Sequence, residues 1–286
     1  MSAGTSLNEA ASLKDKVLFI TGGSRGIGLA IAERAARDGA RIVLAAKTLD
    51  PNPRLPGTLR TAVAAVEAAG GEALAVQTDI RDELAIAEAV RKAVDHFGGI
   101  DILVNNASAI SLTDTAHTQM KRFDLMHGVN ARGTFACTQA CIPALTESAK
   151  AGRRPKVLTL SPPLNLKPHW FAPHHAYTMA KYGMSLCTLG HAAELRPLGI
   201  AVNSLWPRTV IATAALQMIP GVDAQSARKP AIMADAAWHV LTSRDPALTG
   251  RFLIDDEVLV AAGERDFAQY AVQPGRRDLL PDLFLD

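Results

Sequence analysis

A tyrosine and a lysine within the segment AYTMAK could together exchange a proton with a bound molecule. Tyr177 and Lys181 are four residues apart, so both side chains would lie on one face of a helix. A free tyrosine has a pKa of about 10, and proton exchange near neutral pH requires that pKa to fall by about 3, which corresponds to roughly 4 kcal/mol. A nearby ammonium group favours the phenolate. The pair therefore predicts an acid–base site, although the same spacing is also common on exposed helix surfaces.

A second motif, TGGSRGIG at residues 21–28, has the composition of a phosphate-binding turn. It follows the apolar run KVLFI and precedes LAIAERAARDGA, whose apolar residues recur at helical spacing. Glycine at Gly22, Gly26 and Gly28 would permit a tight turn, a close backbone approach and close packing of the helix. The N-terminus of that helix would offer unpaired N–H groups to an anion. The segment predicts a site for the pyrophosphate of a dinucleotide, with a plain strand-to-helix turn as the alternative.

The end of the next apolar strand indicates which dinucleotide would bind. A carboxylate at this position would bond the ribose hydroxyls of NAD, but the chain has Ala45, Ala46 and Lys47 there. Lys47 and Arg25 could instead neutralise a 2′-phosphate. We therefore expect NADP(H) rather than NAD(H), the alternative being that the two cations are only solvated surface charges.

Strand-like and helix-like segments that alternate along the chain must position these motifs. Short apolar runs such as RIVLAA, DILVNNA and KVLTL are separated by helical patterns such as DELAIAEAVRKAVDHFG. Continuous apolar strands between helices predict a doubly wound parallel sheet of the Rossmann type with helices on both faces. Because there is no internal repeat and no linker, we expect one α/β domain. Irregular segments follow the second, fifth and sixth strands, at the sheet edge where ligands bind in such folds.

Composition and charge exclude several other classes of function. The chain of 286 residues is 48% hydrophobic and 20% charged, and no stretch approaches the roughly 18 apolar residues needed to cross a bilayer. The first residues lack the apolar core of a signal peptide, so we expect a soluble cytoplasmic protein without membrane insertion. A net charge of +2 without a basic cluster argues against a nucleic-acid partner. His169, His174 and His175 lack acidic partners at ligand spacing, so we expect no metal site.

The motifs TGGSRGIG, NNA and YTMAK, in this order and spacing, resemble those of the short-chain dehydrogenase/reductase family. The resemblance covers residues 14–263, and the segments AAKTLDPNPRLPGT, NNASAISLTDT, SPPLNL and AYTMAKYGMS look closer still to hydroxysteroid dehydrogenase-like proteins. In eukaryotic relatives a sterol-carrier domain can follow, and the resemblance here includes no such domain. We divide the chain into a flexible leader at 1–13, a dinucleotide-binding catalytic domain at 14–263, and an extension at 264–286 that packs on the body or on a neighbouring subunit.

The resemblance also implies a role for each matching residue. Tyr177 would be the general acid or base, Lys181 would hold the nicotinamide ribose and lower the pKa of Tyr177, and Asn130 would support a water molecule that relays protons. Asp79 could instead cap the helix that begins near Asp82, and Asn130 could stabilise a helix bend. The cofactor would be bound by residues at the ends of several strands: Thr21, Gly22, Ser24, Arg25, Gly26, Ile27, Gly28, Lys47, Asp79, Ile80, Asn105, Asn106, Ala107, Tyr177, Lys181, Pro207 and Thr209.

The chain departs from the family at the serine that usually steadies the substrate oxygen. It reads LSPPLNL, with Ser161 sixteen residues before Tyr177 and Pro162 beside it. The usual serine is thus missing unless Ser161, or Asn165 across an inserted loop, reaches the substrate oxygen. The segments NNAS, WPRT and IDDEV also replace the family's usual NNAG, Pro-Gly turn and glycine-rich turn.

These features predict an oxidoreductase that transfers hydride between NADP(H) and a carbonyl or secondary alcohol carbon. Loop residues could cover an apolar lipid-, acyl- or steroid-like substrate or could simply pack the loops: Trp170, Phe171, Leu216, Met218 and Ile219. Two alternatives remain, the same chemistry with NAD(H) and a nucleotide-bound lipid-binding or regulatory protein with little turnover. By family habit we expect a homo-oligomer, either a dimer or a tetramer.

Overall fold

The computed structural model describes residues 11–50, 56–216 and 221–286, and within them seven strands form one parallel sheet in the order β3-β2-β1-β4-β5-β6-β7. The strands are β1 (Val17–Thr21), β2 (Arg41–Ala46), β3 (Glu72–Gln77), β4 (Ile102–Asn105), β5 (Lys156–Thr159), β6 (Ala201–Trp206) and β7 (Phe252–Ile254). The winding direction reverses between β1 and β4, which creates a crevice at the carboxyl ends of these strands. The predicted doubly wound parallel sheet is confirmed.

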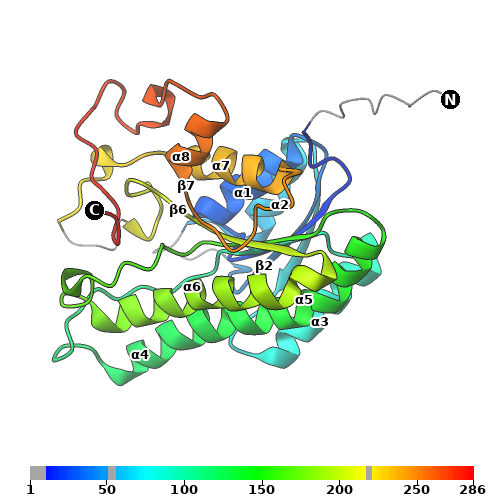
Figure 1. Ribbon diagram of the computed structural model, residues 1–286, viewed down its shortest axis with the longest axis horizontal. Coiled ribbons are helices and arrows are strands. Elements are labelled where there is room, and N and C mark those ends of the chain that lie inside the picture. The colour runs from blue at the N-terminus through cyan, green and yellow to red at the C-terminus, as the bar shows by residue number, and fades with distance from the viewer. Residues whose placement is uncertain (1–10, 51–55, 217–220) are drawn as a thin grey trace.

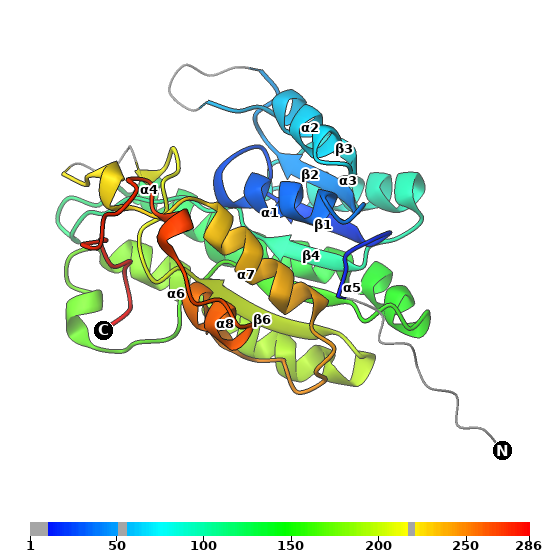
Figure 2. The same cartoon turned by 90° about the horizontal axis from the view of Figure 1, so that it is seen from above.

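Helices cover both faces of the sheet, and Figure 1 shows α5 and α6 across one face with α1, α7 and α8 on the other. Figure 2, seen from above, shows α1 and α7 lying beside each other. The helices are α1 (Gly26–Ala36), α2 (Leu59–Ala68), α3 (Glu83–Phe97), α4 (Met120–His127), α5 (Gly133–Lys150), α6 (His175–Leu195), α7 (Ala231–Thr242) and α8 (Asp255–Ala261). Shorter turns are η1 (Gly128–Arg132), η2 (Pro168–Trp170), η3 (Arg196–Leu198), η5 (Ala224–Ser226) and η6 (Ala268–Tyr270).

The two faces of the central strands fill two separate hydrophobic cores. Along β1, Leu18 and Ile20 pack with residues of α1 and α7, whereas Phe19 packs with residues of α3 and α5. This alternation follows from the two-residue side-chain period of a strand, and both sets are apolar because both faces are covered. The register Phe19↔Val43 and Phe19↔Leu103 places β1 in the middle of the sheet, with its carboxyl end beside those of β2 and β4.

The expected leader at residues 1–13 can be compared with the structure only in part. Residues 1–10 of the leader, and Met218 and Ile219 of the substrate loop, lie outside the described residues. Leu13 is buried and its N–H donates to Asp38 Oδ2 at 2.8 Å, so the packed body begins no later than Leu13. Within the described part of the chain, no helix combines the length and apolarity required to span a membrane.

Residues 264–286 fold back over the body toward the carboxyl edge of the sheet (Figure 1, red end). Backbone hydrogen bonds tie this segment to the loop after β6: Lys229 N–H to Tyr270 O at 2.7 Å, Val272 N–H to Ala227 O at 3.0 Å, and Leu280 N–H to Ser226 O at 2.9 Å. The C-terminal residues are thereby brought to the same edge as the crevice.

A buried carboxylate at the opposite edge of the sheet ties four chain segments together. Asp101 accepts hydrogen bonds from Val17 N–H at 2.8 Å, from Ser148 Oγ at 2.6 Å and from Arg153 Nε at 2.6 Å. Burial alone would raise the pKa of Asp101, but the hydrogen bonds from Arg153, Ser148 and Val17 outweigh it and hold that pKa below its ordinary value.

We expect Asp101→Asn to lower the free energy of unfolding at pH 7 by about 2 kcal/mol, because a charge-assisted acceptor is lost inside the protein. Since the folded-state pKa of Asp101 is lowered, its stabilisation is fully present above the unfolded value of about 4 and disappears as the pH falls below it. Urea unfolding between pH 7 and pH 3 should therefore show the two proteins converging in acid. Asp95→Asn, which alters an exposed ion pair with Arg91, is the matched control and should change stability little. A constant difference across this pH range would contradict the assignment.

Candidate active site

The glycine-rich turn between β1 and α1 has the geometry that its sequence predicts. Gly26 has a φ of +57°, which favours glycine, and a Cβ added at Gly28 would lie 2.4 Å from Asn106 Nδ2 and 2.9 Å from Gly22 O. Arg25 is the N-cap of α1 and makes no side-chain cap hydrogen bond, so the first N–H groups of α1 are not capped by a side chain. This helix N-terminus can therefore accept an anion.

A polar network joins the turn to the end of β4 and forms the floor of the crevice. Thr21 Oγ1 accepts from the N–H groups of Asn106 at 3.0 Å and Ala107 at 3.1 Å. The amide of Asn106 donates to Thr21 O at 2.9 Å and Gly22 O at 3.1 Å. Asn105 lies beside them and its amide nitrogen donates to Thr138 Oγ1, while its Oδ1 is buried without a hydrogen-bond partner among the described residues.

Three charged side chains meet where the sequence predicts the adenosine of a dinucleotide to lie. Lys47 Nζ lies 3.1 Å from Asp79 Oδ2, and Arg81 Nε donates to Asp79 Oδ1 at 3.0 Å. Hydrogen bonds from Arg81 are the main reason that the pKa of Asp79 lies well below its usual range. Asp79 thus pairs with cations, whereas Asp82 is the residue that caps α3. The sequence interpretation named Lys47 and Asp79 but missed Arg81.

Other predicted cofactor residues lie around this end. Arg25 donates from its guanidinium to Gly57 O at 2.8 Å, Ser24 is buried, and Ile27 packs against the core. Ile80 is buried next to α5, where a Cβ added at Gly133 would lie 2.7 Å from Ile80 Cδ1. Ile80 therefore contributes an apolar wall.

The Tyr177–Lys181 pair lies in the first turns of α6, and both side chains are buried, each 4% exposed. Lys181 Nζ donates to Leu160 O at 2.9 Å and lies 5.0 Å from the centroid of the Trp206 ring. Burial lowers the pKa of Lys181 to about 7. The pair is brought to the carboxyl edge, as the sequence predicts.

The pKa of Tyr177 is raised in this structure, whereas the sequence analysis expects it to be lowered. Burial, followed by the negative charge of Asp282, raises the pKa of Tyr177 above its ordinary value. The groups of the chain itself therefore keep its hydroxyl protonated. A lowered pKa remains a prediction for the complex with a positively charged nicotinamide ring.

Asn130 lies at the centre of the π-helical turn η1 that joins α4 to α5. Its side chain is fully buried and is held by both backbone groups of Ala109: Oδ1 accepts from the N–H at 2.7 Å, and Nδ2 donates to the carbonyl at 3.0 Å. Asn130 thus fixes the loop after β4 against a widened helical turn. Such turns are frequent at functional sites, and the expected proton-relay water remains a prediction.

The structure engages the side chains of both Ser161 and Asn165 with partners inside the chain. Ser161 is fully buried, and its Oγ lies 2.8 Å from Ser204 Oγ inside the sheet–helix core. Asn165 Nδ2 donates to Asp286 Oδ2 at 3.0 Å, which engages its amide with the C-terminus. Each side chain thus already has a partner within the chain, and the suggestion that one of them replaces the usual serine stays a prediction.

The loop after β6 places two further predicted residues at the crevice. Pro207 leads to Thr209, whose Oγ1 is buried and has no hydrogen-bond partner among the described residues. Arg208 N–H donates to Asp255 Oδ1 at 2.8 Å, and burial raises the pKa of Asp255 to about 6. Asp255 belongs to the segment IDDEV, where the sequence departs from the family pattern.

Two C-terminal residues at the site were missed by sequence reasoning. Burial raises the pKa of Asp282 to about 7, and its charge acts on both Tyr177 and Lys181. Phe284 is 1% exposed and its ring stacks toward that of Tyr177, with centroids 6.2 Å apart and planes at 29°. The apolar residues of PDLFLD were the only available signal, and they carry no period that assigns them to a site.

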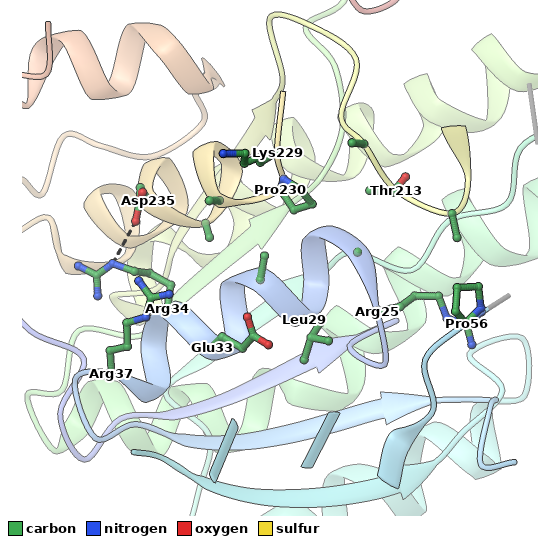
Figure 3. Close-up of a pocket in the computed structure, with 16 residues that line it drawn as sticks. Arg25, Leu29, Glu33, Arg34, Arg37, Pro56, Thr213, Lys229, Pro230 and Asp235 are labelled. Atoms are coloured by element: carbon green, nitrogen blue, oxygen red, sulfur yellow. Dashed lines mark hydrogen bonds and ion pairs between the residues drawn. The ribbon is translucent and has the colours of Figure 1, made fainter. Parts of the chain in front are cut away.

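A cavity of about 410 Å³ lies next to the glycine-rich turn, between α1 and α7. Figure 3 shows Arg25 and Thr213 at one end of it and the hydrogen-bonded pair Arg34 and Asp235 at the other. It borders the expected phosphate site, whereas Tyr177 and Lys181 are not among its lining residues.

Comparison with known proteins agrees with this geometry. The model of the short chain dehydrogenase family matches residues 16–220. Hydroxysteroid dehydrogenase-like protein 2 from Xenopus laevis is 57% identical over 282 residues, which are 98% of this chain but 66% of the length of that protein.

Two crystal structures are similar over almost their whole length. A protein from Xanthomonas campestris, described provisionally as a dehydrogenase, is 60% identical with a TM-score of 0.92, covering 96% of this chain and 99% of its own. A short chain dehydrogenase from Mycobacterium thermoresistibile is 52% identical with a TM-score of 0.89, covering 96% of each chain. The chain therefore belongs to the short-chain dehydrogenase/reductase family, whose members interconvert alcohol and carbonyl groups with a nicotinamide dinucleotide.

Proposed function

We propose that the protein is an NADP(H)-dependent oxidoreductase that interconverts an apolar carbonyl compound and its secondary alcohol, with Tyr177 as the general acid and base. The observation that carries the proposal is the buried Tyr177–Lys181 pair at the carboxyl edge, in the crevice that the glycine-rich turn enters. Family membership supports the class of chemistry, and the aromatic surroundings of Tyr177 support an apolar substrate.

The residues present fit a dinucleotide. Buried Thr209 Oγ1 and Asn105 Oδ1 have no hydrogen-bond partners among the described residues, and the first turn of α1 lacks a side-chain cap. Polar groups of this kind are stabilised when a ligand satisfies them. The turn at 21–28 would hold the pyrophosphate, Lys47 the adenosine ribose, and Lys181 and Thr209 the nicotinamide end.

When bound, the nicotinamide supplies or accepts the hydride. In the direction of reduction Tyr177 would donate its hydroxyl proton to the substrate oxygen, and in oxidation it would take that proton back. Lys181 would place a positive charge beside this hydroxyl. The carboxylate of Asp282 favours the charged form of Lys181 and opposes the lowering of its pKa by burial.

We expect Tyr177→Phe to reduce single-turnover oxidation of bound NADPH by apolar ketones, aldehydes or 3-oxoacyl thioesters at least about 100-fold, because the proton donor is lost. Stopped-flow absorbance of NADPH is the measurement, and NADPH affinity should stay within about two-fold. Tyr270→Phe is the matched control, since Tyr270 bonds Asp235 away from the crevice. Equal rates in the two variants would reject Tyr177 as the acid.

Selectivity for NADP(H) is supported by Lys47 and Arg81 at the proposed adenosine end, with Arg25 of the glycine-rich turn as a further cation. Lys47 forms an ion pair with Asp79, and its side chain is still 60% exposed. It can therefore turn toward a 2′-phosphate. The same chemistry with NAD(H) is the alternative, since Asp79 offers a carboxylate in the same place.

We expect Lys47→Ala to weaken NADPH binding about ten-fold and to leave NADH binding unchanged, because only NADPH carries the phosphate. Fluorescence titration of both cofactors gives the affinities, and Lys150→Ala, an exposed lysine paired with Glu147, is the control. A parallel loss for both cofactors would favour the NAD(H) alternative.

A second candidate function is a nucleotide-bound lipid-binding or regulatory protein with little turnover. It is favoured by the core position of Ser161 and by the low exposure of Tyr177. Tight NADPH binding without oxidation by any ketone, aldehyde or 3-oxoacyl thioester would support it.

We also propose a homo-oligomer formed through α5 and α6. Large apolar side chains of these helices are exposed, including Phe135 at 50% and Leu186 at 58%. Such exposed apolar surface is typical of subunit contacts. We expect light scattering after size exclusion to give a dimer or tetramer, and Leu186→Glu to lower the assembled fraction. A wild-type monomer at micromolar concentration would contradict the proposal.

A further inference from the structure

The last seven residues, 280–286, form a strap that crosses the crevice beside the catalytic pair. Residues 280–282 run antiparallel to the loop after β6, with Val210 N–H donating to Leu280 O at 3.0 Å and Asp282 N–H to Arg208 O at 3.0 Å. Trp206 Nε1 then donates to Leu283 O at 3.0 Å. The strap is therefore held to the loop that contains the predicted cofactor-binding residues Pro207 and Thr209.

Phe284 inserts from this strap into an aromatic cluster, defined as Trp170, His174, Tyr177, Tyr182 and Trp206. The centroid of the Phe284 ring lies between 5.3 and 6.2 Å from the ring centroids of all five. These separations are typical of favourable aromatic pairs. The cluster thus forms a subsite of the size and polarity of one apolar ring, and the chain's own phenyl group fills it.

The position of Phe284 conflicts with access of a substrate to Tyr177. A general acid must come within about 3 Å of the atom that takes its proton. Tyr177 is only 4% exposed, and Phe284 stacks toward its ring. A carbonyl group that reaches the Tyr177 hydroxyl must therefore bring its neighbouring substituent into the space that Phe284 occupies.

The strap is held in a way that permits its release. Phe284 has a φ of +73°, a left-handed conformation that is strained for a bulky side chain and is maintained only by its surroundings. Beyond it, the chain is anchored by Asp286, which accepts from Lys167 Nζ at 2.8 Å and from Asn165 Nδ2 at 3.0 Å. The ion pair is exposed, with 59% and 48% of the two side chains accessible. Exposed pairs of this kind are weak latches.

The charges around the cluster indicate which end of a substrate can enter. Asp255 is buried and Asp282 is partly buried, the two act on each other at this edge, and Asp282 also acts on Tyr177. The side chains around Phe284 are aromatic rings, and burying a charged group among them without a partner is costly. We therefore expect the group next to the reacting carbonyl to be neutral.

We propose that the aromatic cluster is the apolar subsite for the substrate, that Phe284 occupies it as an internal competitor, and that a neutral cyclic or aryl group next to the substrate carbonyl displaces Phe284. The role of Tyr177 in this proposal rests on the proposed function. The exchange of one ring for another in the cluster does not depend on it.

The first test weakens the latch without touching the aromatic cluster. Asp286→Ala removes the anchor, and the matched control Asp278→Ala removes another acid of the C-terminal segment, whose partner is Arg276 outside the crevice. Binding of acetophenone and of 2-octanone to the full chain is followed by fluorescence, since Trp170 and Trp206 belong to the cluster. We expect Asp286→Ala to bind acetophenone about two- to five-fold more tightly, because a larger fraction of the protein is open, and Asp278→Ala to match the wild type.

The second test removes the competitor itself. Phe284→Ala should bind acetophenone about ten-fold more tightly than the wild type and should gain less for the linear 2-octanone, which cannot fill a ring-shaped subsite. Thermal unfolding of both variants shows whether Phe284→Ala remains folded. If Phe284→Ala does not fold, the acetophenone affinity of Asp286→Ala decides whether the proposal holds. Unchanged acetophenone affinity in the folded variants, or an equal gain for both ketones, overturns the proposal.

Oxidation of NADPH by acetophenone separates this proposal from the proposed function. Tighter binding of acetophenone in the strap variants without NADPH oxidation would keep the subsite and reject the reductase. Oxidation whose KM is the same in wild type, Asp286→Ala and Phe284→Ala would keep the reductase and reject Phe284 as a competitor.

Discussion

A chain of buried hydroxyl groups fixes α6 against the sheet, and the position of the Tyr177–Lys181 pair depends on it. Ser161 Oγ lies 2.8 Å from Ser204 Oγ, which lies 2.7 Å from Thr188 Oγ1, and Ser185 Oγ donates to Pro162 O at 2.6 Å. Each of these groups is fully buried or nearly so, and leaving one unpaired costs about 1–3 kcal/mol. Helix α6 therefore cannot slide along β5 and β6.

Tyr177 and Lys181 precede Ser185 by eight and four residues on the same helix face, so the same contacts set their depth in the crevice. Ser161 thus has a structural role in this contact between β5, β6 and α6.

Burial disfavours the charged form of Lys181, and groups from separate chain segments counteract this effect. The ammonium group of Lys181 lies over the Trp206 ring and donates to Leu160 O. These two contacts stabilise its charge only in part, so burial still lowers the pKa of Lys181. The acid that favours its charged form, Asp282, lies in the C-terminal strap, and the charge of Asp255 at the start of α8 acts in turn on Asp282. The loop after β6 connects them, because Arg208 bonds Asp255 through its N–H and Asp282 through its carbonyl. The charge at the site is therefore coupled to the position of the C-terminus.

The sequence predicted those parts of the site that depend on local patterns. The glycine-rich turn, the lysine after β2 and the Tyr177–Lys181 spacing are each set by neighbours in the chain, and the parallel sheet brings their ends together. Arg81 was missed because an exposed arginine two residues after Asp79 looks like any solvated charge. Phe284 and Asp282 were missed for a different reason. Their partners lie more than 70 residues away, and a Pro-interrupted tail has no periodicity from which a buried face can be read.

Covering Tyr177 with the chain's own aromatic group also bears on the direction of the proposed reaction. Burial and the charge of Asp282 both raise the pKa of Tyr177, so the covered site holds a protonated phenol. A protonated phenol is ready to donate to a carbonyl oxygen, whereas oxidation of an alcohol requires the phenolate, which this environment disfavours. Positive charge from Lys181 and from an oxidised nicotinamide would have to offset that preference before Tyr177 could act as a base. The strap therefore does more than fill space, because it helps to bury Tyr177 and carries Asp282, whose charge adds to the effect of burial on the pKa of Tyr177. On the proposed function, the covered form is poised for reduction of a carbonyl.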